Sequence, residues 1–137
     1  MRMDRKIIAA VSIIVIAAIV ISVTSDLALD ESTISQTIFV DAVYESKNKI
    51  VRITYNDNSE MTNLITLEVL GMEKTFHKEF SQSSFVETIE FNSEPKYGWS
   101  TTPIVFSINH DQFGKIGLKT EIYEQDESKP RIIYSKI

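Results

Sequence analysis

The chain opens with a long uncharged apolar run and then changes to short stretches in which apolar and polar residues alternate. From Ile7 to Ser25 no residue is charged, and nearly all are Ile, Val or Ala. An α-helix rises about 1.5 Å per residue, so a run of this length can cross the hydrocarbon core of a bilayer. The pattern predicts one transmembrane helix over residues 7–25.

The charges on either side of the run predict its direction. Arg2, Arg5 and Lys6 precede it, whereas Asp26 and Asp30 follow it. Basic residues favour the cytoplasmic side of a membrane. We therefore expect a cytoplasmic tail over residues 1–6 and a plasma-membrane protein whose remaining chain lies outside the cytoplasm, in a bacterial or archaeal envelope.

Two other interpretations of the N-terminal run stay open. Val23 and Ser25 are small residues placed for cleavage of a signal peptide before Asp26, but the run is longer than the usual apolar region of a signal peptide. An uncleaved signal-anchor is therefore favoured. The order of basic tail, apolar helix and β domain also resembles that of type IV pilins and archaellins, and this resemblance implies a filament subunit processed at its N-terminus.

A pair of small residues marks one face of the predicted membrane helix. Ala18 and Ser22 are four positions apart, the spacing at which small side chains let a second helix approach closely. They are a candidate helix-packing face. Alanine is also a common filler in such segments, so a helix without a specific partner on this face is the favoured interpretation.

The rest of the chain has the periodicity of β-strands. Residues 26–34 are a short polar link, helical periodicity is absent after residue 30, and a folded domain is expected over residues 35–137. Seven or eight antiparallel strands are expected, separated by turn-forming clusters. The runs are Thr37–Tyr44, Ile50–Tyr55, Leu64–Leu70, Thr75–Phe80, Phe85–Phe91, Ile104–Ile108, Ile116–Tyr123 and Arg131–Ser135.

The size of this domain, the number of strands and the late turn and strand over residues 113–123 resemble an immunoglobulin-like or fibronectin-III-like β-sandwich. The resemblance covers roughly residues 35–137 and implies a mainly β fold of two antiparallel sheets. The inter-sheet cysteines and the strand-C tryptophan of true immunoglobulin domains are absent.

Composition removes several classes of function. The net charge is −5 although the N-terminal tail is basic, so the domain is acidic and nucleic acid is not expected as a partner. There is no cysteine, which excludes disulfides, thiolate metal sites and cysteine nucleophiles. The four glycines form no phosphate-binding pattern. No cofactor is predicted.

Candidate chemistry is sparse. The two histidines, His77 and His110, are the only pair that could begin a metal site, and their spacing matches no ligand motif. No sequence context nominates a nucleophile, so no catalytic residue is predicted. The oxygen-rich stretch 56–60 lacks the glycine and the late glutamate of an EF-hand, and we expect a solvated hairpin turn there.

The most distinctive local stretch is the loop over residues 96–103, which holds the single tryptophan. Tyr97, Trp99 and Thr101 are candidate contacts with a partner, because Trp and Tyr are favoured at binding hot spots. The same rings could instead close one end of the sandwich or rest against lipid headgroups, and packing is favoured over recognition. The leading hypothesis is a non-enzymatic interaction module or accessory subunit that binds a membrane or envelope protein. The alternative is an extracytoplasmic enzyme or metal-binding domain that uses His77 and His110.

Overall fold

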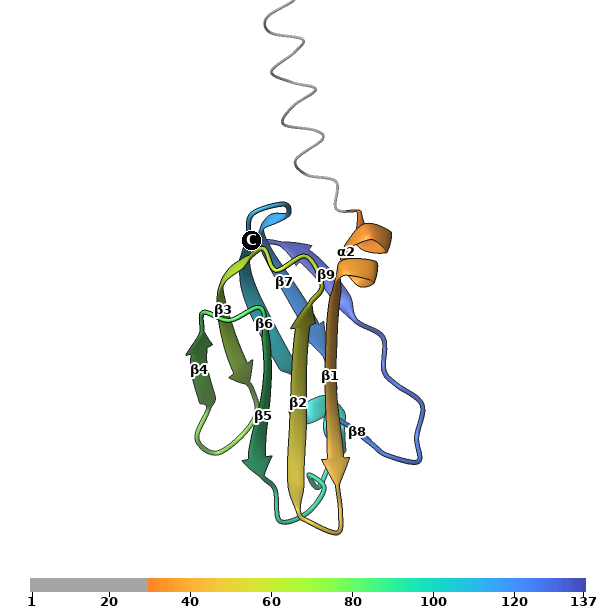
Figure 1. Ribbon diagram of the computed structural model, residues 1–137. Coiled ribbons are helices and arrows are strands. Elements are labelled where there is room, and N and C mark those ends of the chain that lie inside the picture. Colours follow the sequence, from red (N-terminus) through yellow and green to blue (C-terminus); the bar gives the residue numbers. More distant parts are fainter. Residues whose placement is uncertain (1–29) are drawn as a thin grey trace, which may run out of the picture.

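Residues 30–137 form two β-sheets and one short α-helix in the computed structural model, which describes this part of the chain (Figure 1). The predicted membrane helix, the basic tail and the Ala18 and Ser22 face lie outside the described residues. Within residues 30–137, no helix is long and apolar enough to cross a membrane. The prediction of a mainly β, antiparallel-rich fold is confirmed.

Strands alternate along the described chain with short turns and one longer loop. The elements in order are α2 Glu31–Thr37, β1 Ile38–Glu45, β2 Ile50–Asp57, β3 Thr62–Val69, β4 Phe76–Phe80, β5 Ser84–Glu90, the 3₁₀ helix η1 Trp99–Thr101, β6 Ile104–His110, β7 Gly114–Thr120, β8 Tyr123–Glu124 and β9 Ile133–Lys136.

The sheets have the strand orders β5-β2-β1-β8 and β4-β3-β6-β7-β9. All neighbouring strands are antiparallel except β1 and β8, which run parallel. The expected strand over 116–123 is two strands in different sheets, because the chain crosses over after Thr120 and pairs with β1 at Val43 and Tyr44. The two sheets pack face to face as a β-sandwich.

The core lies between the sheets and comes from alternate residues of the central strands. Tyr55 of β2, Leu67 of β3 and Phe106 of β6 are fully buried, while their strand neighbours point outward. This alternation is the period of two that the sequence displays, because successive side chains of a strand point to opposite faces. It explains why the strand positions could be predicted closely.

A helix occupies part of the predicted polar link, so the expectation of no helix after residue 30 is wrong. The Asp30 carboxylate accepts hydrogen bonds from the Thr33 backbone N–H at 3.1 Å and from the Thr33 hydroxyl at 2.6 Å, which caps α2. Ile34 is 1% exposed and packs into the core. At seven residues the helix is too short to show a helical period in the sequence.

The order of the strands defines two ends of the sandwich (Figure 1). The turns over 58–61 and 111–113 lie beside α2, and we call this the α2 end. The loops over 46–49, 70–75 and 91–103 lie at the opposite end, the far end. The loop that carries Tyr97 and Trp99 is therefore separated by the length of the strands from the point where the chain enters the domain.

Candidate functional site

The loop over 91–103 closes the far end of the sandwich with the indole of Trp99. Trp99 is 7% exposed, and its ring lies 4.9 Å from that of Tyr44 and 5.6 Å from that of Phe91, measured between centroids. Gly98, with φ at 89°, lets the backbone turn into the 3₁₀ helix that begins at Trp99. Trp99 is thus a packing residue, and its surface is not free to contact a partner directly.

The three candidate contacts have different environments. Tyr97 is 78% exposed, and the Lys96 ammonium lies 5.4 Å from the centre of its ring. Thr101 is exposed, but its hydroxyl donates a hydrogen bond to the carbonyl of Gly98 at 2.7 Å, within the loop. The structure therefore leaves Tyr97 as the aromatic side chain that this loop presents to solvent.

A cleft of about 340 Å³ lies beside this loop. Met72, Phe91 and Pro95 supply its apolar part, and Glu73 and Glu94 supply carboxylates. Phe91 also contacts Trp99, so the buried aromatic group and the cleft share one wall. The far end consequently combines a rigid aromatic base, an exposed tyrosine and a hollow, a combination typical of protein-binding surfaces.

The two histidines do not converge. Within the five-stranded sheet, His77 of β4 pairs with Glu68 of β3. His110 of β6 pairs with Thr62, which is also in β3. Those β3 positions are six residues apart, which corresponds to roughly 20 Å along a strand. His77 is exposed whereas His110 is 3% exposed. The two side chains therefore share no ligand sphere, and residues 30–137 contain no group of three or more potential metal ligands.

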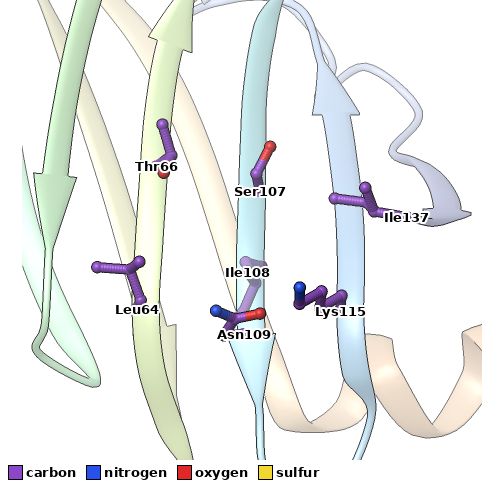
Figure 2. Close-up of a pocket in the computed structure, with 7 residues that line it drawn as sticks. All are labelled: Leu64, Thr66, Ser107, Ile108, Asn109, Lys115 and Ile137. Atoms are coloured by element: carbon purple, nitrogen blue, oxygen red, sulfur yellow. The ribbon is translucent and has the colours of Figure 1, made fainter.

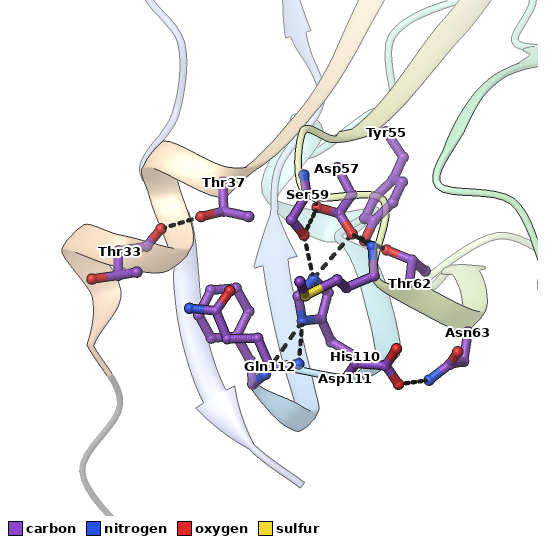
Figure 3. A network of polar contacts seen from close by, with 12 residues as sticks. Thr33, Thr37, Tyr55, Asp57, Ser59, Thr62, Asn63, His110, Asp111 and Gln112 are labelled. Carbon is purple, nitrogen blue, oxygen red and sulfur yellow. Dashed lines mark hydrogen bonds and ion pairs between the residues drawn. The ribbon is translucent and has the colours of Figure 1, made fainter.

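His110 instead belongs to a buried polar network that the sequence analysis missed (Figure 3). Its Nε2 lies 3.0 Å from Oδ2 of Asp57, which is only 2% exposed. The hydroxyls of Ser59 and Thr62 donate to the same carboxylate at 2.6 and 2.7 Å. Tyr55 extends the network, with its hydroxyl 2.8 Å from that of Thr62. Residues from the 58–61 turn and β6 are thereby joined beside α2.

The hydrogen bonds fix the tautomer of the histidine. Nδ1 of His110 accepts the backbone N–H groups of Gln112 and Phe113 at 3.1 and 3.3 Å, so this nitrogen carries no proton. The proton of the neutral ring is therefore on Nε2, which donates to Asp57. The ring also stacks on Phe113, with 4.6 Å between centroids.

The network contains Ser, His and Asp but does not have the geometry of a catalytic triad. In a triad, the carboxylate and the hydroxyl bind opposite nitrogens of the imidazole, so that the imidazole takes the proton of the hydroxyl while the ionised carboxylate orients the ring. Here both Ser59, at 3.2 Å, and Asp57 approach Nε2, while Nδ1 is occupied by backbone groups. The Ser59 hydroxyl also donates to Asp57 and so has no free base. The arrangement stabilises the fold at the α2 end.

The environment of Asp57 favours its charged form. Burial raises the pKa of this carboxyl, but the hydrogen bonds from Ser59 and Thr62 lower it by more, and the net pKa lies below the ordinary value of 3.8.

A signal for this site was present in the sequence. Asp57 continues the inward series of Val51, Ile53 and Tyr55, and His110 continues that of β6. The expectation of a solvated turn over 56–60 is wrong for Asp57.

A second hollow, of about 200 Å³, lies on the outer face of the five-stranded sheet (Figure 2). Leu64 and Thr66 of β3, Asn109 of β6, Lys115 of β7 and Ile137 line it. At its side, the Ser135 hydroxyl lies over Gly117, where an added Cβ would approach to 2.8 Å. The hollow therefore lies next to the part of the outer face where the side chains are smallest.

In comparisons with known proteins, no family model, no curated protein and no solved structure matched this chain.

Proposed function

We propose that this protein is a membrane-tethered, extracytoplasmic interaction module that binds a membrane or envelope protein through the far-end loop. The observation that carries the proposal is the 78% exposure of Tyr97 on a loop whose base is packed. A large apolar ring left in solvent is costly to an isolated domain and favourable at an interface. Trp99 supports this ring from below by fixing the loop, and does not contact the partner itself.

The distance between the two ends constrains the partner. Because α2 begins at Glu31, only about five residues follow the expected membrane helix before the folded domain. They span at most about 18 Å when extended. The eight residues of β1 then separate the α2 end from the far end by roughly 26 Å. The proposed partner is therefore a protein of the same membrane or envelope whose surface lies within reach of the far end, at a distance from the membrane set by the link and the length of β1.

We further propose that the sandwich is of the immunoglobulin-like or fibronectin-III-like kind. With β1, β2, β3, β5, β6 and β7 lettered A, B, C, E, F and G, the pairs A–B, B–E, C–F and F–G are those of such folds. β4 pairs with strand C, whereas the fourth strand of a constant-type immunoglobulin domain pairs with strand E. Folds of this kind serve many functions, so the resemblance supports a binding role only weakly.

The enzymatic or metal-binding alternative gains no support from residues 30–137, since His77 and His110 are far apart and the Ser59 network lacks a free base. An accessory subunit whose membrane helix packs on partner helices remains a variant of the main proposal. It differs only in using Ala18 and Ser22 in addition to the far end.

The test is site-specific photocrosslinking of the full-length protein in its native membrane. A benzoylphenylalanine at position 97 should give one discrete crosslinked product with another protein. The matched control is the same residue at Val86, which is 57% exposed on the outer face of β5. Equal products from both positions, or none from position 97, would refute the proposal.

A further inference from the structure

We propose that two copies of this chain pair through the outer faces of their five-stranded sheets, as a parallel dimer about a two-fold axis that runs along the strands. The observation behind this proposal is a charge gradient across that face. Outward residues form rows perpendicular to the strands, and one row contains, in order, His77, Glu68, Val105, Lys119 and Ile133. The acid lies on β3 and the lysine on β7, on either side of the central strand β6.

A two-fold axis along β6 would reverse the strand order of the second copy beneath the first. β3 of one copy then faces β7 of the other at the same height. Glu68 of each copy therefore faces Lys119 of its partner, and the pairing occurs twice. In the single chain, the basic group nearest to the Glu68 carboxylate is the imidazole of His77, whose Nδ1 lies 4.0 Å away, and no lysine or arginine within residues 30–137 pairs with it.

The neighbouring row explains how closely two such faces could approach. It contains Thr66, Ser107, Gly117 and Ser135, all small, with Glu79 at the β4 edge. Gly117 has no side chain to separate the sheets. The face on either side of this row carries apolar side chains, those of Leu64, Ile137 and Ile133. Ile133 and Ile137 are 57% and 64% exposed. Two copies would thus bury apolar side chains that the single chain leaves in water.

Charge also selects the direction of packing. An axis perpendicular to the strands would place β3 over β3, so that the acidic side of one copy met the acidic side of the other. It would also send the two α2 ends in opposite directions. The axis along the strands puts both α2 ends on the same side, as two chains anchored in one bilayer require. This last point rests on the proposed membrane tether, whereas the charge argument does not.

The available area suits a pair that the membrane helps to form. Strands β3, β4, β6, β7 and β9 contain 8, 5, 7, 7 and 4 residues, which at about 3.3 Å per residue and about 4.8 Å between strands give a face of roughly 490 Å². Two copies would bury roughly 980 Å², at the lower limit of about 1,000 Å² for a specific interface, which is the range of weak pairs. Confinement to one membrane raises the effective concentration of such weakly pairing domains.

The test exploits the absence of cysteine from the chain. Ser107 lies at the centre of the face, so in the dimer Ser107 of one copy faces Ser107 of the other. Packed sheets lie about 10 Å apart, beyond the reach of a disulfide, so a short bis-maleimide is the suitable reagent. Full-length S107C in its membrane should give a covalent dimer. T54C, at the centre of the outer face of the other sheet, is the matched control and should give roughly tenfold less.

A charge exchange makes the test specific. E68K or K119E in the S107C background should each reduce the crosslinked dimer roughly five- to tenfold, because either creates two like-charge pairs. The double variant E68K/K119E should restore it. Equal crosslinking at S107C and T54C, or a double variant no better than the singles, would overturn the dimer. Neither result bears on whether a different protein crosslinks at position 97, so failure here is distinguishable from failure of the proposed function.

Discussion

Nε2 of His110 lies 3.0 Å from Oδ2 of Asp57, and both side chains are removed from water although 53 residues separate them in the chain. Buried charges of this kind persist only where hydrogen bonds replace the lost hydration. Asp57 accepts two hydroxyl groups, two backbone N–H groups and the imidazole. The pair therefore ties the 58–61 turn to the end of β6, and through Asn58, whose N–H donates to Thr37, to α2.

Asp57→Asn should destabilise the domain by about 3 kcal/mol, because the amide turns an N–H₂ group toward donors that now lack an acceptor. Urea unfolding followed by Trp99 fluorescence is the measurement. Asp111→Asn is the control, since this exposed carboxylate accepts a single side-chain hydrogen bond, from Asn63, and should change stability by no more than about 0.5 kcal/mol. Similar losses in both variants would mean that the network contributes little.

The lowered pKa of Asp57 predicts a specific loss of stability in acid. Its folded pKa lies below the ordinary value of 3.8, so the charged form is favoured by folding. That contribution is complete above pH 3.8, and it disappears as the pH falls through the folded pKa. Between pH 5 and pH 2, the wild type should therefore lose more unfolding free energy than Asp57→Asn does. Parallel pH profiles would contradict this origin of the acid sensitivity.

The far-end loop makes a different prediction, which concerns the indole nitrogen of Trp99. Nε1 is buried and has no hydrogen-bond partner. Trp99→Phe keeps an aromatic ring against Tyr44 and Phe91 and removes an unsatisfied donor, so it should cost about 1 kcal/mol or less. Trp99→Ala leaves a cavity at the end of the sandwich and should cost about 3 to 5 kcal/mol. Thermal unfolding by circular dichroism compares the two, and equal losses would show that the ring itself contributes nothing.

What the sequence reveals depends on the range of the interaction. Strands β1 to β7 were predictable because the alternation of residues such as Val51, Arg52 and Ile53 is local and repeats over each strand. α2 was missed because a seven-residue helix with one buried residue, Ile34, has no detectable period. β8 was missed as a separate strand because two residues that pair in parallel with a distant strand leave no pattern of their own.

The candidate site was predictable only in part, for a related reason. The loop around Trp99 stood out by its aromatic residues, but which ring is inside depends on the packing of Tyr44 and Phe91 from other strands. Asp57 and His110 each continue an inward series of their own strand, and that signal was available. Their pairing was not, because it depends on how β3 places the 58–61 turn against the end of β6.

Two glycines at the far end differ in what they allow, and this difference tests how the loop that presents Tyr97 is held. Gly71 and Gly98 both have positive φ values, of 76° and 89°, so a side chain at either position strains the backbone. Gly98 also has ψ at 171°, a region that almost only glycine adopts, so the strain there is about 1 to 3 kcal/mol. A Cβ at Gly71 would in addition lie 1.8 Å from the carbonyl oxygen of Thr101, whereas a Cβ at Gly98 meets nothing within 4 Å. Gly71→Ala must therefore push the 70–75 turn away from the Tyr97 loop.

We expect Gly98→Ala to cost about 1 to 3 kcal/mol and Gly71→Ala at least about 4 kcal/mol, because the backbone atoms of Thr101 cannot move aside as a flexible side chain can. Urea unfolding measures both losses, and Trp99 fluorescence of the folded variants reports whether the loop has shifted. In the photocrosslinking test, Gly71→Ala should also reduce the product from position 97 more than Gly98→Ala does. If the two variants are equally stable and crosslink equally, the close approach of Gly71 to Thr101 does not hold the loop.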